Sequence, residues 1–273
     1  MSNSQQRVIS ALVMVIVLAL IFWLGHQYML GLLLLAGVIM VDEIYTNFLK
    51  RERLEWNYLF AHLGLILPFT HLFFIERSDD LVRMMTNGAV ALNFLLIIYL
   101  FTIRLESTRL TSFAQRFPIP TGIFILLPLC SLGGIIDQAS WIKILTLLLV
   151  VNFGMDSGAW FFGRNFGRHK LWPAISPNKT IEGVIGGMLT AAILGGIVSH
   201  LLLGKMGVTH FLFFMLLGLL AQMGDLIQSK LKRQFGIKDS SSLIPGHGGV
   251  YDRVDSLIFL APFFAITLDF IYN

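Results

Sequence analysis

The chain of 273 residues is 56% apolar, with 23 phenylalanines, 13% charged residues, a formal net charge of +4 and a mean hydropathy of +0.76. This composition excludes a soluble globular protein and indicates an integral membrane protein. The single cysteine, Cys130, lies in an apolar run, which excludes an internal disulfide and a metal–thiolate cluster.

Apolar runs of about 17 to 25 residues, the length needed to cross the hydrocarbon core, predict nine transmembrane helices joined by short connections. The predicted fold class is therefore an all-α, polytopic membrane protein. No small-residue cleavage site follows the first run, so we interpret it as a retained helix and not as a signal peptide. The predicted spans cover residues 8–25, 28–47, 57–75, 86–103, 119–135, 141–162, 181–203, 208–228 and 256–272.

The basic residues are distributed unequally between the two sides of this nine-helix arrangement. The side that holds the amino terminus receives 16 of the 20 Lys and Arg residues. Positively charged loops remain in the cytoplasm, so we expect a cytoplasmic amino terminus and an external carboxyl terminus. The polar features concentrate after residue 150, and no internal repeat is evident. We therefore interpret residues 1–140 as a transmembrane scaffold and residues 141–273 as the region that carries the chemistry.

The first polar loop, residues 156–187, combines glycines, arginines and a predicted helix start. Glycines allow close backbone approach, arginines donate paired hydrogen bonds to phosphate oxygens, and a helix amino terminus presents free amides. For the basic residues, a solvated positive charge attracted to anionic lipid is the structural alternative. The candidate substrate-binding residues of this loop are Asp156, Arg164, Arg168, Ser176 and Lys179.

Two further features of this loop indicate structure and not chemistry. The run Ser-Pro-Asn-Lys-Thr-Ile-Glu is typical of a helix start, with Ser176 or Thr180 as the capping residue. The glycines that follow predict a face on which two helices pack closely. These glycines are Gly183, Gly186, Gly187, Gly195 and Gly196.

The second polar loop, residues 225–256, carries three carboxylates that could hold a metal. Asp225 lies among apolar residues, where an acid is costly unless it has a partner; an ion pair with Lys232, Arg233 or Arg253 is the structural alternative. Asp252 and Asp255 are three residues apart at a predicted helix start, which places both on one face. Magnesium takes one or two carboxylates while substrate phosphates complete its coordination, so the loop suits a metal and a polyanion together.

The remaining polar residues of the second loop leave more than one interpretation open. His247 lies between glycines that could bring its ring and the adjacent amides of Gly248 and Gly249 to a phosphate, although a lone loop histidine is commonly only solvated. The pair Lys238-Asp239 could bind substrate or simply keep the loop in water. Both loops are predicted on the cytoplasmic side, where a phospholipid substrate could enter from the membrane and a soluble phosphate compound from the cytosol.

The polar residues of the second loop resemble the signature of the phosphatidate cytidylyltransferases, also called CDP-diacylglycerol synthases. The resemblance covers residues 150–260 strongly, and the first loop fits a second polar block of that family, with Trp160 where a tyrosine is expected. The signature residues are Ser229-Lys230-Leu231-Lys232-Arg233, Lys238-Asp239, Pro245-Gly246-His247-Gly248-Gly249 and Asp252-Arg253-Val254-Asp255-Ser256.

The resemblance implies a magnesium-dependent enzyme that converts CTP and phosphatidate into CDP-diacylglycerol and pyrophosphate for phospholipid synthesis. It also implies a homodimer, and it leaves open whether one or two metal ions are bound. The implied metal ligands are Asp225, Asp252 and Asp255, and the implied substrate-binding residues include Gly248 and Gly249 beside those of the first loop. The implied catalytic residues are Lys232, Arg233, Lys238, Asp239, His247 and Arg253.

Two other functions are compatible with parts of the sequence. An ion-coupled transporter would use intramembrane acids such as Asp156 and Asp225, but it predicts polar residues spread through the spans. A related enzyme could use CTP on another lipid phosphate or on a polyprenol, since the apolar spans carry no readable code for the lipid. We expect a bacterial inner-membrane protein that contacts membrane lipid and binds no nucleic acid.

Overall fold

The computed structural model describes residues 3–272 and divides the chain into two compact units. The first unit comprises Met1–Met85, Glu106–Gln138 and Lys232–Val254. The second unit comprises Thr86–Leu105, Ala139–Leu231 and Asp255–Asn273. Each unit is thus assembled from separate stretches of sequence, and the division into a scaffold before residue 140 and a chemical region after it stays a prediction.

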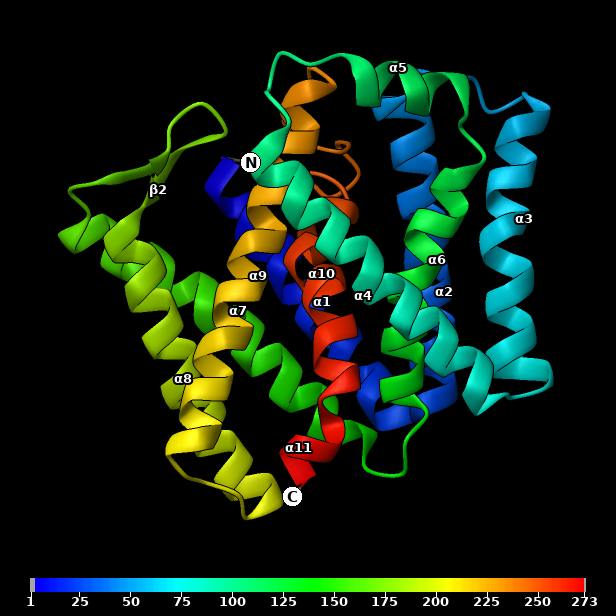
Figure 1. Ribbon diagram of the computed structural model, residues 1–273. Helices are drawn as coiled ribbons and strands as arrows, with labels where there is room; N and C mark the ends of the chain where they lie inside the picture. Colours follow the sequence, from blue (N-terminus) through cyan, green and yellow to red (C-terminus); the bar gives the residue numbers. More distant parts are fainter. Residues whose placement is uncertain (1–2, 273) are drawn as a thin grey trace. The chain divides into compact units, whose positions relative to one another are not determined.

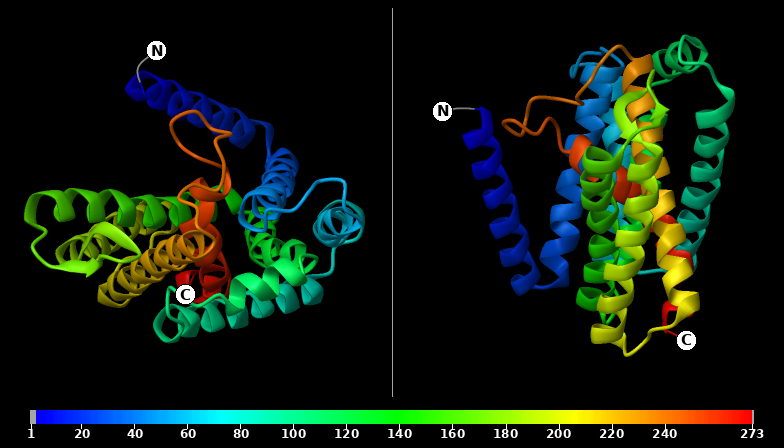
Figure 2. Two further views of the ribbon diagram at one scale, coloured as in Figure 1. Left: turned by 90° about the horizontal axis from the view of Figure 1, so that it is seen from above. Right: turned by 90° about the vertical axis from the view of Figure 1, so that its left-hand side faces the viewer.

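The first unit begins with a helical hairpin, α1 and α2, that turns at Gly25 (Figures 1 and 2). The φ angle of Gly25 is +111°, a conformation that L side chains rarely adopt. Helix α6 packs on α2 and α3, and a Cβ added at Gly122 would collide with the Ala61 carbonyl of α3. The elements are α1 (Asn3–Leu24), α2 (His26–Glu43), the π-helix η1 (Ile44–Phe48), α3 (Trp56–Thr70), the π-helix η2 (His71–Ile75), the start of α4 (Asp79–Thr102), α5 (Arg109–Arg116), α6 (Pro120–Ile136) and the polar ends of α9 and α10.

The second unit is built around α7 and α8, which lie side by side and are joined by a two-stranded hairpin (Figures 1 and 2). The strands are antiparallel, with Lys170 opposite Thr180 and Trp172 opposite Ser176. The Thr180 hydroxyl accepts a hydrogen bond from the Gly183 amide and caps α8, as the sequence predicts. The elements are most of α4, α7 (Trp141–Phe166), β1 (Lys170–Trp172), β2 (Ser176–Thr180), α8 (Ile181–Leu203), α9 (Val208–Gln234), α10 (Tyr251–Ile266) and α11 (Leu268–Tyr272).

The structure confirms an all-α, polytopic membrane protein, in which the β-structure of the described residues is the short hairpin and an isolated bridge between Ile244 and Gly248. Within residues 3–272, six helices are long and apolar enough to cross a membrane, and a seventh span results if the bent pair α5 and α6 counts as one. The apolar part of α1, Val8–Leu24, and helix α10 are shorter than this criterion requires. The number of nine spans and the predicted orientation stay predictions.

The predicted glycine face lies between α7 and α8. A Cβ added at Gly187 would lie 2.7 Å from the carbonyl oxygen of Met155, and one at Gly183 would lie 2.8 Å from that of Ala159. Both contacts are with backbone atoms, which cannot rotate away as a side chain can. The two helices therefore approach closely because these positions carry no side chain. Gly196 differs, since a Cβ there would meet nothing within 4 Å.

We predict that Gly187→Ala lowers the thermal unfolding midpoint of the protein in detergent, because the added methyl group forces α7 away from α8. Overpacking of this kind typically costs about 1–3 kcal/mol. The matched control is Gly196→Ala, which adds the same methyl group to the same helix in open space. The unfolding midpoint of the control should equal or exceed that of the wild type, since alanine stabilises a helix by about 1 kcal/mol relative to glycine. Equal midpoints for the two variants would contradict the prediction.

Candidate active site

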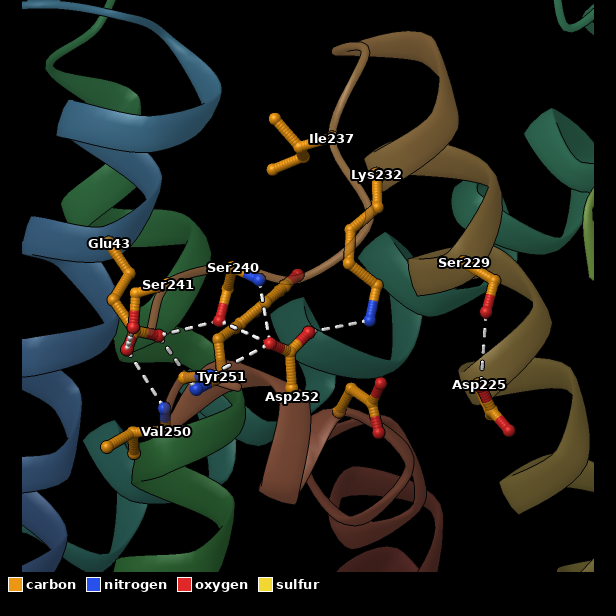
Figure 3. Close-up of polar contacts among 12 residues, drawn as sticks. Glu43, Asp225, Ser229, Lys232, Ile237, Ser240, Ser241, Val250, Tyr251 and Asp252 are labelled. Atoms are coloured by element: carbon orange, nitrogen blue, oxygen red, sulfur yellow. Dashed lines mark hydrogen bonds and ion pairs between the residues drawn. The ribbon is translucent and has the colours of Figure 1, made fainter. Parts of the chain in front are cut away.

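Asp252 lies in the first turn of α10 and has hydrogen-bond donors on both carboxylate oxygens (Figure 3). Its Oδ1 accepts from Lys232 Nζ at 2.7 Å. Its Oδ2 accepts from the Ser240 amide at 2.7 Å, the Ser240 hydroxyl at 2.9 Å and the Gly249 amide at 3.0 Å. The Asp252 side chain is only 4% exposed and that of Lys232 10% exposed, so the two form a buried ion pair.

These contacts change the acidity of Asp252. Burial is the largest single influence and acts to raise the pKa of the carboxyl group, because it disfavours the charged form. The hydrogen bond and positive charge of Lys232, with the amides of Gly249 and Ser240, outweigh burial and hold the pKa below its usual value. Asp252 is therefore a carboxylate at neutral pH, as a metal ligand must be.

Glu43 supplies a second buried carboxylate to the first unit, from the last residue of α2. Its Oε1 accepts from the Ser241 hydroxyl at 2.7 Å and the Val250 amide at 2.9 Å. Its Oε2 accepts from the Tyr251 amide at 2.9 Å and the Ser240 hydroxyl at 3.0 Å. We call the set Glu43, Lys232, Ser240, Ser241, Gly249, Val250, Tyr251 and Asp252 the Asp252 cluster (Figure 3).

Two glycines allow the loop before α10 to wrap around these carboxylates. Gly248 has a φ angle of +85°, in the region that favours glycine. A Cβ at Gly249 would lie 2.4 Å from Glu43 Oε1 and 2.0 Å from the Ser240 hydroxyl. Both positions are therefore restricted to glycine by geometry, and the Gly249 amide itself binds Asp252. The Gly249 amide is thus paired with Asp252 in this structure, and the phosphate-binding role expected for Gly248 and Gly249 stays a prediction.

The second unit contains a smaller polar group, which we call the Asp225 cluster: Lys179, Asp225 and Ser229. Lys179 Nζ on β2 lies 2.5 Å from Asp225 Oδ2 on α9, and the Ser229 hydroxyl donates to Asp225 Oδ1 at 3.3 Å. The side chains of Lys179 and Asp225 are 20% and 29% exposed, so solvent and solutes can reach this pair. The partner of the acid is thus a lysine of the first polar loop.

Lys230, one helical turn before Arg233, has a structural role. Its side chain is buried, and its ammonium group donates to the carbonyl oxygens of Tyr99, Leu100 and Ile103 at the end of α4. The ammonium group also lies 4.6 Å from the centre of the Tyr99 ring. A positive charge at a helix carboxyl terminus is favourable, because the last carbonyl groups have no partner within the helix.

The other residues predicted from the sequence lie in more exposed places. His247 Nδ1 lies 2.7 Å from the Ser10 hydroxyl of α1, and Arg233 donates to the Ile237 carbonyl group. Arg164 lies over the ring of Trp160. Asp255 accepts from the Ser256 amide, and Ser176 opens β2. Arg164 is exposed, as are the remaining predicted residues Asp156, Arg168, Lys238, Asp239 and Arg253.

A cavity of about 620 Å³ adjoins the Asp252 cluster within the first unit. Its lining includes Glu43, Asn47 and Ser241, together with an ion pair in which Arg53 donates twice to Asp42, at 2.7 Å each. The lining therefore combines hydroxyl and amide groups with charges that are partly compensated. The side chains of Ile39, Leu54 and Leu243 add an apolar part to the lining.

Sequence reasoning did not identify Glu43, Ser240 or Ser241. A signal was present for Glu43, because an acid at the end of an apolar span needs a partner just as Asp225 does. The two serines lie in the run Asp-Ser-Ser-Ser, where nothing distinguishes a solvated serine from one that binds a buried carboxylate. Only the fold shows that α2 and this loop meet.

Comparison with known proteins agrees with the resemblance carried by the two polar loops. Residues 5–271 match the sequence profile of the cytidylyltransferase family. The chain belongs to this family. A phosphatidate cytidylyltransferase of Staphylococcus haemolyticus is 31% identical over 96% of the chain and 98% of its own length. That of Bacillus subtilis is 30% identical over 96% and 97%, and that of Haemophilus influenzae is 44% identical over 47% and 46%.

We predict that Lys232→Met destabilises this cytidylyltransferase strongly, because removing one partner of a buried ion pair typically costs about 3–5 kcal/mol. Asp252→Asn in the same chain should recover part of the loss, since no buried carboxylate then lacks its cation. A double-mutant cycle on thermal unfolding in detergent measures the coupling, which we expect at about 1–3 kcal/mol.

The matched control for this cycle is Arg53→Met, which breaks the ion pair with Asp42. The Arg53 side chain is 64% exposed, so this change should cost less than about 1 kcal/mol. Strictly additive effects of the Lys232 and Asp252 substitutions would show that the ion pair contributes nothing to the stability of the fold.

Proposed function

We propose that this cytidylyltransferase transfers the cytidylyl group of CTP to phosphatidate, giving CDP-diacylglycerol and pyrophosphate for phospholipid synthesis. The relatives named phosphatidate cytidylyltransferase support this proposal, since two of them match nearly the whole chain. The observation that carries it is a pair of Lys–Asp contacts, Lys232 with Asp252 and Lys179 with Asp225. In each contact, the carboxylate can bind a divalent metal ion and the ammonium group can bind a phosphate.

When substrate binds, the lysine of each pair can turn from the carboxylate to a phosphate, and the carboxylate can bind a metal ion in place of the lysine. Without substrate, the ammonium group compensates the carboxylate. A phosphate group and a divalent cation together can replace the two partners of such a pair without leaving a charge uncompensated. This exchange explains why the two lysines are kept close to acids and do not simply project into water, as positive-inside residues would.

The residues present fit magnesium only if substrate oxygens complete its coordination. Among the described residues, no group of three or more His, Cys, Asp or Glu side chains could hold a metal by itself. This agrees with the preference of Mg²⁺ for one or two carboxylates, several waters and substrate phosphates. We propose Asp252 in the first unit and Asp225 in the second as carboxylates that would each bind Mg²⁺ together with substrate oxygens, and Asp255 as a ligand or a neighbour of a ligand. When bound, the ion neutralises phosphate charge and makes the α-phosphorus a better electrophile.

The reaction needs no amino-acid nucleophile. A phosphate oxygen of phosphatidate attacks the α-phosphorus of CTP, the bond from that phosphorus to the bridging oxygen breaks, and pyrophosphate leaves with the electron pair. Charge and position therefore decide the rate. We assign Lys232 and Lys179 to phosphate oxygens, and assign the exposed Arg164, Arg168, Lys238 and Arg253 to the capture of the two anionic substrates.

The remaining features of the proposal concern location and assembly. We propose that the enzyme is a homodimer of the bacterial inner membrane and that its polar loops face the cytoplasm, where CTP is available. The bacterial relatives and the distribution of basic residues support this arrangement. An enzyme that uses CTP on another lipid phosphate or on a polyprenol is the second candidate, since the apolar spans carry no readable code for the lipid.

We predict that the purified protein converts phosphatidate and labelled CTP into CDP-lipid and pyrophosphate in equal amounts, and that EDTA stops the reaction until Mg²⁺ is restored. Thin-layer chromatography of the lipid and a coupled pyrophosphate assay would measure the two products. Folded protein that gives no CDP-lipid would contradict the proposal, and a panel of lipid phosphates and polyprenols would then identify the acceptor.

We predict that Asp252→Asn and Asp225→Asn each lower kcat by at least about 100-fold, because losing even an outer partner of a metal costs about 10- to 100-fold. The control is Asp80→Asn, an exposed acid in the first turn of α4, which should retain wild-type turnover. Steady-state kinetics at saturating CTP and Mg²⁺ would decide. Near-normal kcat in either site variant would remove that carboxylate from the metal site.

A further inference from the structure

Glu43 binds the start of the helix that carries Asp252. Its carboxylate accepts from the amides of Val250 and Tyr251, where α10 begins. The first amides of a helix have no partner within the helix, and they favour a negative charge. Glu43 on α2 therefore acts as an amino-terminal cap for α10, although it lies more than 200 residues away in the sequence.

The same carboxylate also fixes the loop that binds Asp252 from the other side. It accepts from the hydroxyl groups of Ser240 and Ser241. Ser240 in turn contacts Asp252 through its amide at 2.7 Å and through its hydroxyl oxygen at 2.9 Å. Glu43 thus hydrogen-bonds directly to both segments that hold the Asp252 carboxylate, which are Ser240-Ser241 and the start of α10.

The Ser240 hydroxyl oxygen lies within hydrogen-bonding distance of both carboxylates but carries a single hydrogen. This one hydrogen therefore serves two carboxylates, either shared between them or donated to one of them. The Glu43 carboxylate, which is 2% exposed, otherwise has three donors from Ser241, Val250 and Tyr251.

We propose that Glu43 is a positioning residue for the transfer reaction: it holds residues 239–251 in the one conformation in which Asp252 and Lys232 are correctly placed. This inference rests on the role proposed for Asp252. Glu43 itself touches no substrate in this scheme and acts through the backbone of Val250 and Tyr251 and through Ser240. The part of the chain predicted to be scaffold thereby contributes a residue on which turnover depends.

The experiment compares Glu43→Gln with the wild type by steady-state kinetics and by hydrogen–deuterium exchange. The amide of glutamine places a donor against the donors of the loop, which leaves buried polar groups unpaired. We expect kcat to fall about 10- to 100-fold, in the range found for residues that orient metal ligands. The KM values for CTP and phosphatidate should stay within about twofold, and amide exchange should accelerate only in residues 239–251.

Two further variants keep the test decisive if Glu43→Gln folds poorly. Ser241→Ala removes a single donor to Glu43 and should give a smaller fall in kcat with the same localised exchange. Glu106→Gln alters an exposed acid of the same unit and should match the wild type in both measurements. Loss of protection spread through the whole first unit in both Glu43→Gln and Ser241→Ala would overturn the positioning role, since Glu43 would then only stabilise the fold.

Measuring Asp252→Asn in the same series separates this inference from the proposed function. Inactive Asp252→Asn with normal kcat and normal exchange in Glu43→Gln would overturn the role of Glu43 and leave the proposed function intact. Active Asp252→Asn would overturn the role proposed for Asp252, and with it the positioning role of Glu43, even if the exchange of residues 239–251 showed that Glu43 orders the loop.

Discussion

The arrangement of the polar residues in the first unit depends on the cost of burying the Glu43 carboxylate. A carboxylate removed from water is tolerated only if donors replace the lost hydration, and here two hydroxyl groups and two backbone amides do so. Three of these four donors belong to a loop that has little apolar surface to hold it in place. The demand of one buried charge therefore gives a polar, glycine-rich loop a single conformation.

A second buried carboxylate follows from the first. Once the loop is fixed, the amides of Ser240 and Gly249 point at Asp252, and the ammonium group of Lys232 completes its environment. The pKa of Asp252 is lowered although burial alone would raise it. Lys232 on α9, together with the loop amides of Gly249 and Ser240, thus keeps the acid ionised, which is the state that a ligand for a divalent cation requires.

The sequence predicted the helices well where hydropathy alone decides and less well where polar contacts extend a helix. The predicted span 181–203 coincides with α8, whereas the predicted span 208–228 is shorter than α9, which continues to Gln234. The apolar run ends before Lys230, but the helix continues past Lys232. It can do so because the Lys230 ammonium group binds backbone carbonyl groups and that of Lys232 binds Asp252. The hairpin of residues 170–180 was not predicted, since its short strands are polar and carry no alternation.

The residues of the candidate site were also predicted only in part from the sequence. Asp252 and Asp225 could be singled out from the sequence, because an acid beside apolar residues needs a reason and the family signature supplies one. Glu43 satisfies the same physical criterion, but it lies about 200 residues from its partners in a stretch with no signature, and its donors are mostly backbone amides and serines. A residue whose role is to bind backbone leaves no pattern of side chains to recognise. Its contribution becomes visible only when the chain is folded and each buried charge is matched with its donors.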